Sequence, residues 1–308
     1  MITIKKKFSD SFNFVYNKIA LVRVDLNCPI QDQEVSDPTR IEKVIPTILK
    51  LLEKKAKIII ISHLGRPKGI PSENLSLKKV FDKLEIILEK KLYFCDVPIK
   101  NLKKDFLKKK FDEFEIILLE NIRFYPEEEK FEDDFIKKLS SLGDIFVNEC
   151  FSCSHRKHSS IAGIPKLLPS FPGLLLEKEI QNLKKLFFIT NDLNSIAIIG
   201  GSKISTKISL IEFYTKKFSK VLIGGAMANT ISLALGNEIG VSLHEKKMLQ
   251  LAKEIIDEYS DKIIVPEDVI VTDKKIKNIP VVKSINKIDT KDMIVDIGPQ
   301  TRMLFYNE

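Results

Sequence analysis

The sequence predicts an α/β protein with two doubly wound parallel-sheet (Rossmann-like) domains. Short continuous runs of Ile, Val, Leu and Phe, typical of strands buried on both faces, alternate with helical periodicities. No hairpin dipeptide such as Asn-Gly or Asp-Gly separates the runs, which favours parallel pairing. The length of 308 residues corresponds to two domains at roughly 150 residues each.

In the first half, the apolar runs predict four strands, and the apolar stripes between them predict helices. The strands are Ile19–Val24, Lys57–Ile61, Glu115–Leu119 and Asp144–Val147. One helix carries Ile41, Val44, Ile45, Ile48 and Leu51, after a Ser36-Asp37-Pro38 start whose proline suits a first helical turn. Another carries Leu77, Val80, Phe81, Leu84 and Leu88, with Ser76 as the predicted N-cap.

The second half repeats this pattern after a proline-rich segment. Its predicted strands are Ile196–Ile199, Lys220–Ile223, Lys262–Val265 and Met293–Val295, and a helical stripe carries Met248, Leu251, Ile255 and Tyr259. Three of the 13 prolines lie in Gly163–Gly173, which we take as the domain boundary. Residues 174–188 follow as one bridging helix. We therefore predict a first domain at 1–173, an interdomain helix at 174–188 and a second domain at 189–308.

The positive charge of the chain indicates a small acidic ligand. A formal net charge of +8 and a pI near 9.0 are compatible with nucleic-acid binding, but no nucleic-acid-binding motif accompanies them. Most basic residues are lysines in helix-like stretches, whereas the six arginines are Arg23, Arg40, Arg66, Arg123, Arg156 and Arg302. Because the planar guanidinium fork grips carboxylates and phosphates bidentately, we expect small anions as ligands and no nucleic-acid partner.

The sequence shows no sign of a membrane-spanning, secreted or disulfide-stapled protein. No apolar run approaches the ~20 residues that a membrane helix needs. The basic start MITIKKKFSD has no apolar stretch after it. Four cysteines in a chain of this length do not make a disulfide scaffold. We therefore expect a cytoplasmic protein with no membrane partner.

Polar and basic side chains follow each predicted strand of the first half. They are Asp25 and Asn27 after the first, His63 and Arg66 after the second, Arg123 after the third, and His155, Arg156 and His158 after the fourth, with Arg40 on the first turn of a helix. Ligands of open parallel sheets bind beyond the carboxyl ends of the strands. We therefore expect a site for a compact, multiply anionic molecule, with Asp25 and Asn27 bonding a hydroxyl.

The second half carries a different signal, a Gly-Gly turn after each of two consecutive strands. The first turn, in IAIIGGSKISTKISL, is followed by Lys203 and Lys207, four residues apart on an expected helix. Glycines let the backbone approach a phosphate, and helix N-terminal N–H groups attract it. The second turn lies in VLIGGAMANT. The pair predicts a nucleotide across both turns, although neither matches a Walker A or GxGxxG pattern.

Eight motifs, in order from about residue 20 to 301, resemble those of phosphoglycerate kinases. They are RVDLNCP, SHLGRPKG, LLENIRFYPEEE, VNECFSCSHRKHSS, GLLLEKEI, IIGGSKISTKI, IGGAMANT and DIGPQT. The resemblance implies a monomeric enzyme of glycolysis and gluconeogenesis. It would transfer a phosphoryl group reversibly between 1,3-bisphosphoglycerate and ADP, giving 3-phosphoglycerate and ATP, with Mg²⁺ on the nucleotide. In that family the first domain binds phosphoglycerate, the second binds the nucleotide, and a hinge closes them.

The resemblance also implies a role for each matching residue. Phosphoglycerate would be held by Asp25, Asn27, Arg40, His63, Arg66, Arg123 and Arg156. Arg40 and Lys203 would be catalytic, Arg40 facing the phosphoryl group in flight and Lys203 guiding it. Lys207 would hold the nucleotide phosphates, and Gly201, Gly224 and Gly225 would shape the nucleotide cleft. Such transfer needs positioning and positive charge more than a covalent nucleophile.

The chain departs from the family pattern in two places. It stops at Glu308, before the family's WNGPxGxFE segment, GGGD-type turn and last helix, which would supply ribose and magnesium contacts. The resemblance therefore implies that the second domain, at 189–308, is incomplete. We therefore expect catalysis to be impaired more than phosphoglycerate binding. VNEC also replaces the usual VNDA, so that Cys150, Cys153, His155 and His158 form a C-x2-C-x-H-x2-H run. These are zinc-ligand types, but they lie within nine residues, tighter than usual spacing, and we expect no metal site.

Three functions remain open on the sequence alone. The arginines and both lysines favour an active phosphoglycerate kinase. The segments missing after Glu308 favour a truncated, phosphoglycerate-binding remnant with impaired catalysis. Only the net charge favours a nucleic-acid-associated protein, which a steep salt dependence of oligonucleotide binding would reveal.

Overall fold

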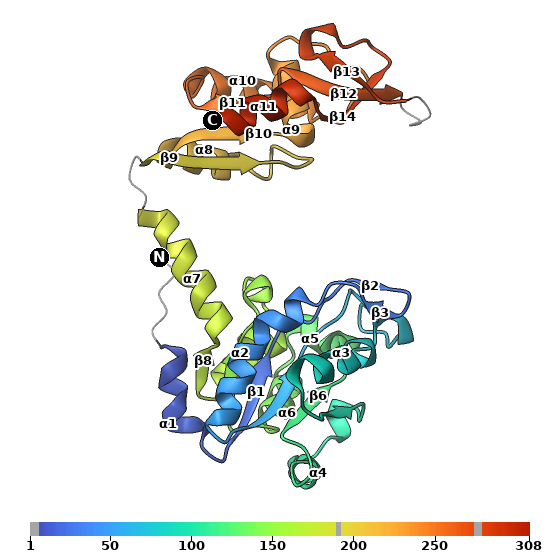
Figure 1. Cartoon of the computed structure of the whole chain (residues 1–308), viewed down its shortest axis with the longest axis vertical. Helices are drawn as coiled ribbons and strands as arrows, with labels where there is room; N and C mark the ends of the chain where they lie inside the picture. Colours follow the sequence, from blue (N-terminus) through green and yellow to red (C-terminus); the bar gives the residue numbers. More distant parts are fainter. Residues whose placement is uncertain (1–5, 189–191, 274–278) are drawn as a thin grey trace. The chain divides into compact units, whose positions relative to one another are not determined.

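A six-stranded parallel sheet forms the centre of the first part of the chain (Figure 1). In spatial order its strands are β5 (Tyr93–Cys95), β6 (Ile116–Leu119), β4 (Lys57–Ile61), β1 (Ile19–Arg23), β7 (Ile145–Asn148) and β8 (Ser170–Pro172). The four strands predicted in this half are confirmed to within one residue at each end. The sequence analysis missed β5 and β8, because three residues are too few to show a period.

The computed structural model describes residues 6–188, 192–273 and 279–308, and the chain divides into two units, Met1–Leu186 and Phe187–Glu308. The helices of the first unit are α1 (Phe12–Val15), α2 (Thr39–Glu53), α3 (Lys78–Leu88), α4 (Lys104–Lys110), α5 (Pro126–Lys130), α6 (Asp133–Ser140) and most of α7 (Leu174–Phe188). A short hairpin joins β2 (Ile30–Gln31) to β3 (Glu34–Val35). Short helical turns lie at Phe8–Ser11, Glu73–Leu75, Ile99–Asn101, Ile122–Phe124, Phe151–Cys153, Ser159–Gly163 and Ile164–Lys166.

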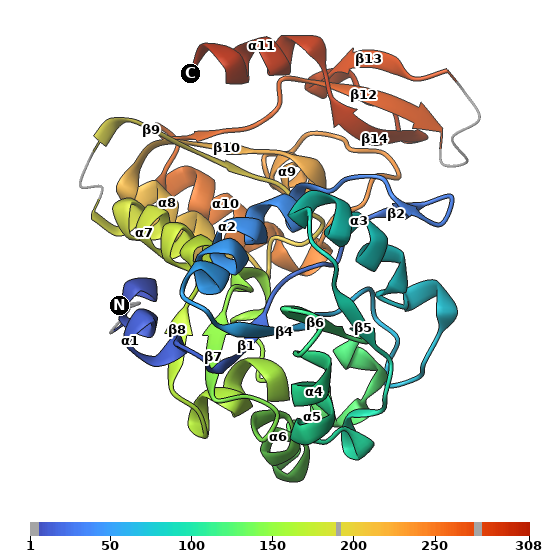
Figure 2. The ribbon, with the colours of Figure 1, turned by 60° about the horizontal axis from the view of Figure 1, so that its bottom comes forward.

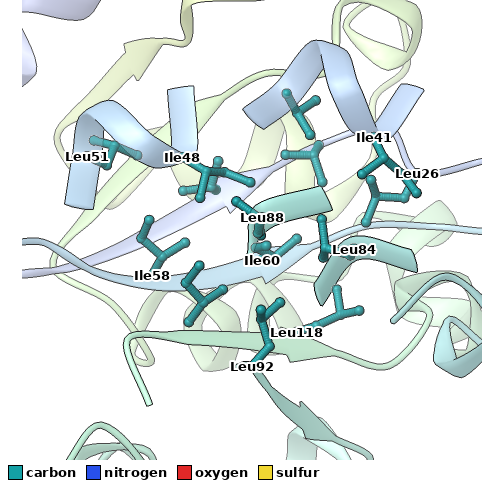
Figure 3. Packing of buried hydrophobic residues seen from close by; sticks show 14 of the residues in the cluster. Leu26, Ile41, Ile48, Leu51, Ile58, Ile60, Leu84, Leu88, Leu92 and Leu118 are labelled. Atoms are coloured by element: carbon teal, nitrogen blue, oxygen red, sulfur yellow. The ribbon is translucent and has the colours of Figure 1, made fainter. Parts of the chain in front are cut away.

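Alternation along the strands builds a core on each face of this sheet. Ile58 and Ile60 face the layer of α2 and α3, whereas Ile59 and Ile61 face the layer of α4 and α6. Figure 2 shows these helix pairs on opposite sides of the sheet, and Figure 3 shows the first core. All four isoleucines are 0% exposed, and each contributes about 1.5–3 kcal/mol to stability by its burial. Cover on both faces explains why the strands read as continuous apolar runs.

Helix α7 begins on a buried carboxylate. Glu149, which follows β7, accepts hydrogen bonds from the backbone N–H groups of Leu175 and Leu176, both at 3.0 Å, and from the Thr47 hydroxyl. A Cβ atom on Gly173 would lie 2.1 Å from a Glu149 carboxylate oxygen. The carboxylate thus satisfies two of the N–H groups that a helix start leaves without partners, and it requires a glycine just before the helix.

Replacing Glu149 with alanine should lower the free energy of unfolding of the first unit by about 2–3 kcal/mol, because buried donors lose their acceptor. Urea unfolding followed by circular dichroism measures the change. Glu179→Ala removes an exposed carboxylate from the same helix and should cost less than about 0.5 kcal/mol. Equal effects of the two substitutions would contradict the capping role of Glu149.

The second unit contains one parallel and one antiparallel sheet of three strands each. The parallel sheet has the order β11 (Ile263–Ile264), β10 (Phe218–Ile223), β9 (Asp192–Ile199), and the antiparallel sheet has the order β13 (Val281–Ser284), β12 (Asp268–Asp273), β14 (Asp292–Ile297). The helices are α8 (Ile208–Lys217), α9 (Gly225–Ala234), α10 (Leu249–Glu258) and α11 (Pro299–Asn307), with short turns at Lys246–Met248 and Ile285–Lys287. All four predicted strands contribute to these sheets.

The expectation of parallel pairing throughout is wrong for the strand at Met293–Val295. It lies within β14, which pairs antiparallel with β12 in a separate sheet. The sequence showed no hairpin signal there because β14 pairs with a strand that is not its neighbour along the chain. No helix in the part of the chain that the structure describes is both long and apolar enough to cross a membrane.

Candidate functional site

The loops after β1, β4 and β6 are joined by hydrogen bonds at Gly65. Its N–H donates to Asn27 Oδ1 at 2.7 Å, and its carbonyl oxygen accepts from the Arg123 guanidinium at 2.8 Å. Gly65 has a φ of +61°, and an added Cβ would lie 2.6 Å from Leu75 Cδ2, so only glycine fits this turn without strain. The adjacent carboxyl ends of these strands thus bring Asn27 and Arg123 together, as the sequence analysis expected.

Asp25 orients Arg40 at this edge. One carboxylate oxygen of Asp25 forms an ion pair with Arg40. The same oxygen accepts a hydrogen bond from the Ser152 hydroxyl group, with 2.6 Å between the two oxygen atoms. The other oxygen accepts from the Asn27 N–H at 3.0 Å. Burial opposes ionisation of Asp25, but the hydrogen bonds from Ser152 and Asn27, with the charges of His63 and Arg40, outweigh it and lower its pKa. Asp25 is therefore an anion that holds Arg40 in place.

Arg23 supports the site from beneath, a role that the sequence analysis did not assign. It is fully buried, and its guanidinium donates to Ser160 Oγ at 2.9 Å and to His63 Nδ1 at 3.2 Å. Because a guanidinium only donates, Nδ1 accepts, and neutral His63 carries its proton on Nε2. Burial, together with the charges of Arg23 and Arg123, lowers the pKa of His63. The sequence signal for this role was the position of Arg23 within an apolar strand, because a buried arginine needs polar partners for its guanidinium.

Three buried nitrogen atoms at this edge have no hydrogen-bond partner among the described residues. They are Arg123 Nε, Arg156 Nε and His158 Nδ1. Burial, together with neighbouring arginines, lowers the pKa of both Arg123 and His158. The site thus combines surplus positive charge with unused nitrogen atoms, as an anion-binding site requires.

Two predicted residues lie outside this hydrogen-bond network of the described chain. Arg66 and His155 are exposed on the loops after β4 and β7. Beside the network lies a cavity of about 660 Å³. Its walls include Asp25, Arg40 and Ser152, and the first turns of α7 supply Leu174, Leu175 and Lys178.

The two Gly-Gly turns of the second unit pack backbone against backbone. Gly201 and Gly225 have φ angles of +144° and +66°, and a Cβ on Gly225 would lie 3.0 Å from the Gly201 nitrogen. Gly224 precedes the first residue of α9, and the Met227 N–H donates to the Gly201 carbonyl at 3.1 Å. The structure thus brings the turns after β9 and β10 together, and a side chain at Gly225 would press on the backbone of Gly201.

The expectation that Lys203 and Lys207 share a helical face is wrong. Helix α8 begins at Ile208, so that both lysines lie in the turn before it. Glu245 holds this turn by accepting from Ser205 N at 2.9 Å and from Ser205 Oγ at 2.6 Å. The Lys207 ammonium donates to the Gly200 carbonyl, whereas Lys203 is exposed. Both lysines therefore lie near the Gly-Gly turn, Lys207 bonded to its backbone and Lys203 facing solvent.

Among the described residues, no three His, Cys, Asp or Glu side chains are grouped so that they could hold a metal ion. The four cysteines are free and buried. Cys28 and Cys95 belong to the two cores of the first unit, as expected of small core residues.

Comparisons with known proteins agree on one family. The family model described as phosphoglycerate kinase matches residues 10–308. The chain is 43% identical over 291 residues to phosphoglycerate kinase of Wolbachia pipientis wMel, covering 93% of this chain and 72% of the relative. It is 39% identical over 300 residues to that of Rhizobium meliloti (strain 1021), covering 96% and 74%. The chain therefore spans about three quarters of the length of these relatives.

Solved structures give the same result. Phosphoglycerate kinase from Pyrococcus horikoshii OT3 is similar with a TM-score of 0.80 and 28% identity, covering 98% of this chain and 77% of that one. The structure from Coxiella burnetii has a TM-score of 0.75 and 32% identity, covering 95% and 75%. These similarities extend over both units.

Proposed function

The chain belongs to the phosphoglycerate kinase family, and from this membership we propose a role for each part of it. As a kinase of this family it transfers a phosphoryl group between 1,3-bisphosphoglycerate and ADP, with 3-phosphoglycerate and ATP as products. Residues 1–173 bind phosphoglycerate, 189–308 bind the nucleotide, and 174–188 form the interdomain helix. The nucleotide brings Mg²⁺ with it as part of the substrate, and the enzyme acts as a cytoplasmic monomer.

One observation carries the phosphoglycerate assignment: surplus positive charge with unused nitrogen atoms beyond the carboxyl ends of the parallel strands. Arg123 Nε, Arg156 Nε and His158 Nδ1 lack hydrogen-bond partners within the described residues. Carboxylates lie 3.7 Å from two of them, Glu129 beside Arg123 Nε and Glu128 beside His158 Nδ1, beyond hydrogen-bond distance. A ligand with one carboxylate and one phosphate supplies acceptors for such groups. We assign phosphoglycerate binding to Asp25, Asn27, Arg40, His63, Arg66, Arg123 and Arg156.

The packed Gly-Gly turns support the nucleotide assignment. Backbone at Gly201, Gly224 and Gly225 carries no side chain that would keep a phosphate away, and the N-terminus of α9 lies beside it. We assign Lys207 to the nucleotide phosphates and Lys203 to the phosphoryl group during transfer. Arg40 and Lys203 are the catalytic residues of this proposal, because both supply positive charge where charge is redistributed.

Calorimetric titration with 3-phosphoglycerate, beside a coupled assay with 3-phosphoglycerate and MgATP, tests the proposal on the 308-residue chain. Saturable binding together with turnover is the expected result. Binding without turnover would support the phosphoglycerate-binding alternative and refute catalysis by this chain. If neither occurs in a folded sample, the site assignment is wrong.

Arg156→Gln is the most informative variant for binding. We expect it to weaken 3-phosphoglycerate binding by roughly tenfold to a hundredfold, the value of a charged hydrogen bond. The fold should persist, because Arg156 Nε has no partner to lose among the described residues. The neighbouring Lys157, which is exposed and lies over the Phe131 ring, provides the control, and Lys157→Gln should bind as the unmodified chain does. Equal weakening by both substitutions would indicate a general charge effect and not a site.

A further inference from the structure

Two thiols lie directly after β7, and the proposed reaction uses neither of them. Cys150 is 0% exposed and Cys153 is 4% exposed, and both pack against Ile161. The sequence Cys150-Phe151-Ser152-Cys153 is thus a C-x2-C segment whose two thiols share one small buried cluster.

The backbone between the two cysteines suits a disulfide. The Cys153 N–H donates to the Cys150 carbonyl at 3.3 Å, which closes one helical turn. Such an i to i+3 turn brings the two Cα atoms within about 7 Å, and a disulfide requires about 4.4–6.8 Å. The bond can therefore form within one short turn, without a rearrangement of the sheet.

The proton-bearing nitrogen of His63 lies beside one of the two sulfur atoms. Cys153 Sγ lies 3.9 Å from His63 Nε2, the nitrogen that carries the proton when Nδ1 accepts from Arg23. The neighbouring Cys150 thiol, the contact with His63 and the charge of Arg23 lower the pKa of Cys153 against the effect of burial. The neighbouring Cys153 thiol and burial raise the pKa of Cys150. Cys153 is therefore the more acidic of the two thiols.

The dithiol contacts the phosphoglycerate site through Ser152. Ser152 Oγ lies 3.5 Å from Cys150 Sγ and 3.9 Å from Cys153 Sγ, and it donates to Asp25 at 2.6 Å. Asp25 in turn forms the ion pair with Arg40. A change in the bonding of the two sulfur atoms therefore acts on Asp25 through Ser152 and on His63 directly.

We propose that Cys150 and Cys153 form a peroxide-reactive dithiol whose disulfide weakens phosphoglycerate binding. The Cys153 thiolate attacks hydrogen peroxide, the O–O bond breaks, and the products are a sulfenic acid on Cys153 and hydroxide. The Cys150 sulfur then attacks Cys153 Sγ, its proton leaves with the sulfenic hydroxyl group as water, and the disulfide forms. In sum, two thiols and one peroxide give one disulfide and two waters. A reducing dithiol reverses the change.

The other two cysteines provide an internal control. Burial raises the pKa of Cys28 to about 11 and also raises the pKa of Cys95. Both are therefore protonated and slow to react with peroxide, because the thiolate is the nucleophile. A small neutral oxidant reaches a nearly buried sulfur more readily than a bulky disulfide reagent does, which is why peroxide is the probe.

Peptide mapping of the 308-residue chain tests the chemistry independently of the proposed function. The folded protein is treated with hydrogen peroxide, quenched with catalase, alkylated in denaturant and digested. We expect Cys150 and Cys153 to be linked and unalkylated, and to become alkylated after dithiothreitol, with Cys28 and Cys95 alkylated throughout. The proposal would be overturned if Cys150 and Cys153 were still alkylated after peroxide treatment. It would also be overturned if Cys153 became a sulfonic acid and no disulfide formed.

Cys150→Ala separates the two steps. Without the second thiol, the sulfenic acid on Cys153 should persist and be labelled by dimedone. A Cys153→Ala chain that still consumed peroxide at Cys150 at the same rate would reverse the assigned roles and refute the mechanism. If either variant fails to fold, the peptide map of the unmodified chain still shows whether the disulfide forms.

The effect on binding rests on the proposed function and is measured separately. The dissociation constant for 3-phosphoglycerate should rise on the order of tenfold on oxidation and recover on reduction. A chain with both Cys150→Ala and Cys153→Ala, which has neither thiol, should show no difference in affinity between peroxide treatment and reduction. Unchanged affinity in a chain that is shown to be linked would refute the coupling. A reduced chain that binds no phosphoglycerate would instead refute the proposed function. The peptide map would still show whether Cys150 and Cys153 form a disulfide.

Discussion

Replacing Arg40 with alanine should lower the rate of phosphoryl transfer by roughly a thousandfold or more. Arg40 lies on the first turn of α2, where 46% of its side chain is exposed and Asp25 orients it by an ion pair. A guanidinium in this setting can offset the charge of a phosphoryl group in flight. The coupled assay measures the loss as a fall in kcat.

Stability should change little in this variant, because Arg40 is half exposed and Asp25 keeps its hydrogen bonds from Ser152 and Asn27. Arg40→Lys keeps the charge but loses the bidentate fork, so its rate should fall between those of the unmodified chain and Arg40→Ala. Lys50→Ala removes a cation from the far end of the same helix, where Lys50 pairs with Glu53, and should leave turnover unchanged. Full turnover by Arg40→Ala would show that the reacting group lies elsewhere.

Lys203→Ala should slow transfer by roughly a hundredfold while leaving the affinity for 3-phosphoglycerate unchanged. Lys203 is exposed in the turn before α8 and belongs to the second unit, whereas the phosphoglycerate residues belong to the first. Its charge should therefore act on the transferring group and not on phosphoglycerate in its ground state. Single-turnover kinetics and calorimetry measure the two quantities separately.

Lys216 provides the matched control for this prediction. It is exposed near the end of α8, so Lys216→Ala removes one positive charge from the same unit but not from the Gly-Gly turn. Its turnover should equal that of the unmodified chain. A Lys203→Ala chain that loses phosphoglycerate affinity and keeps its rate would contradict the role assigned to Lys203.

Most of the candidate anion site could be predicted because the placement of its residues follows from their order along each strand. In a parallel sheet, residues after a strand share the carboxyl edge with residues after its neighbours, so Asp25, Asn27, His63 and Arg123 were assigned to one edge. Arg23 was not assigned, because an arginine inside a strand reveals its partners only when distant segments pack. Its partner Ser160 lies 137 residues away along the chain.

The two lysines show where local patterns fail. A spacing of four residues indicates a shared helical face, and the residues that follow do form α8. The helix begins later than expected because Glu245, 40 residues away, holds Ser205 through its N–H and hydroxyl groups. Helix boundaries depend on such tertiary partners, which sequence spacing does not show.

The sequence by itself determined the alternation of strands and helices, the burial of both sheet faces and the carboxyl-edge position of the anion-binding residues. These features depend on local periodicity and on the sterics of parallel strands, which act over a few residues. Only the tertiary structure decided which nitrogen of His63 carries the proton, which carboxylate caps α7 and which two thiols share a buried cluster. Each of these depends on hydrogen bonds, charges or packing contacts that meet after folding, where burial makes an unpaired polar group costly.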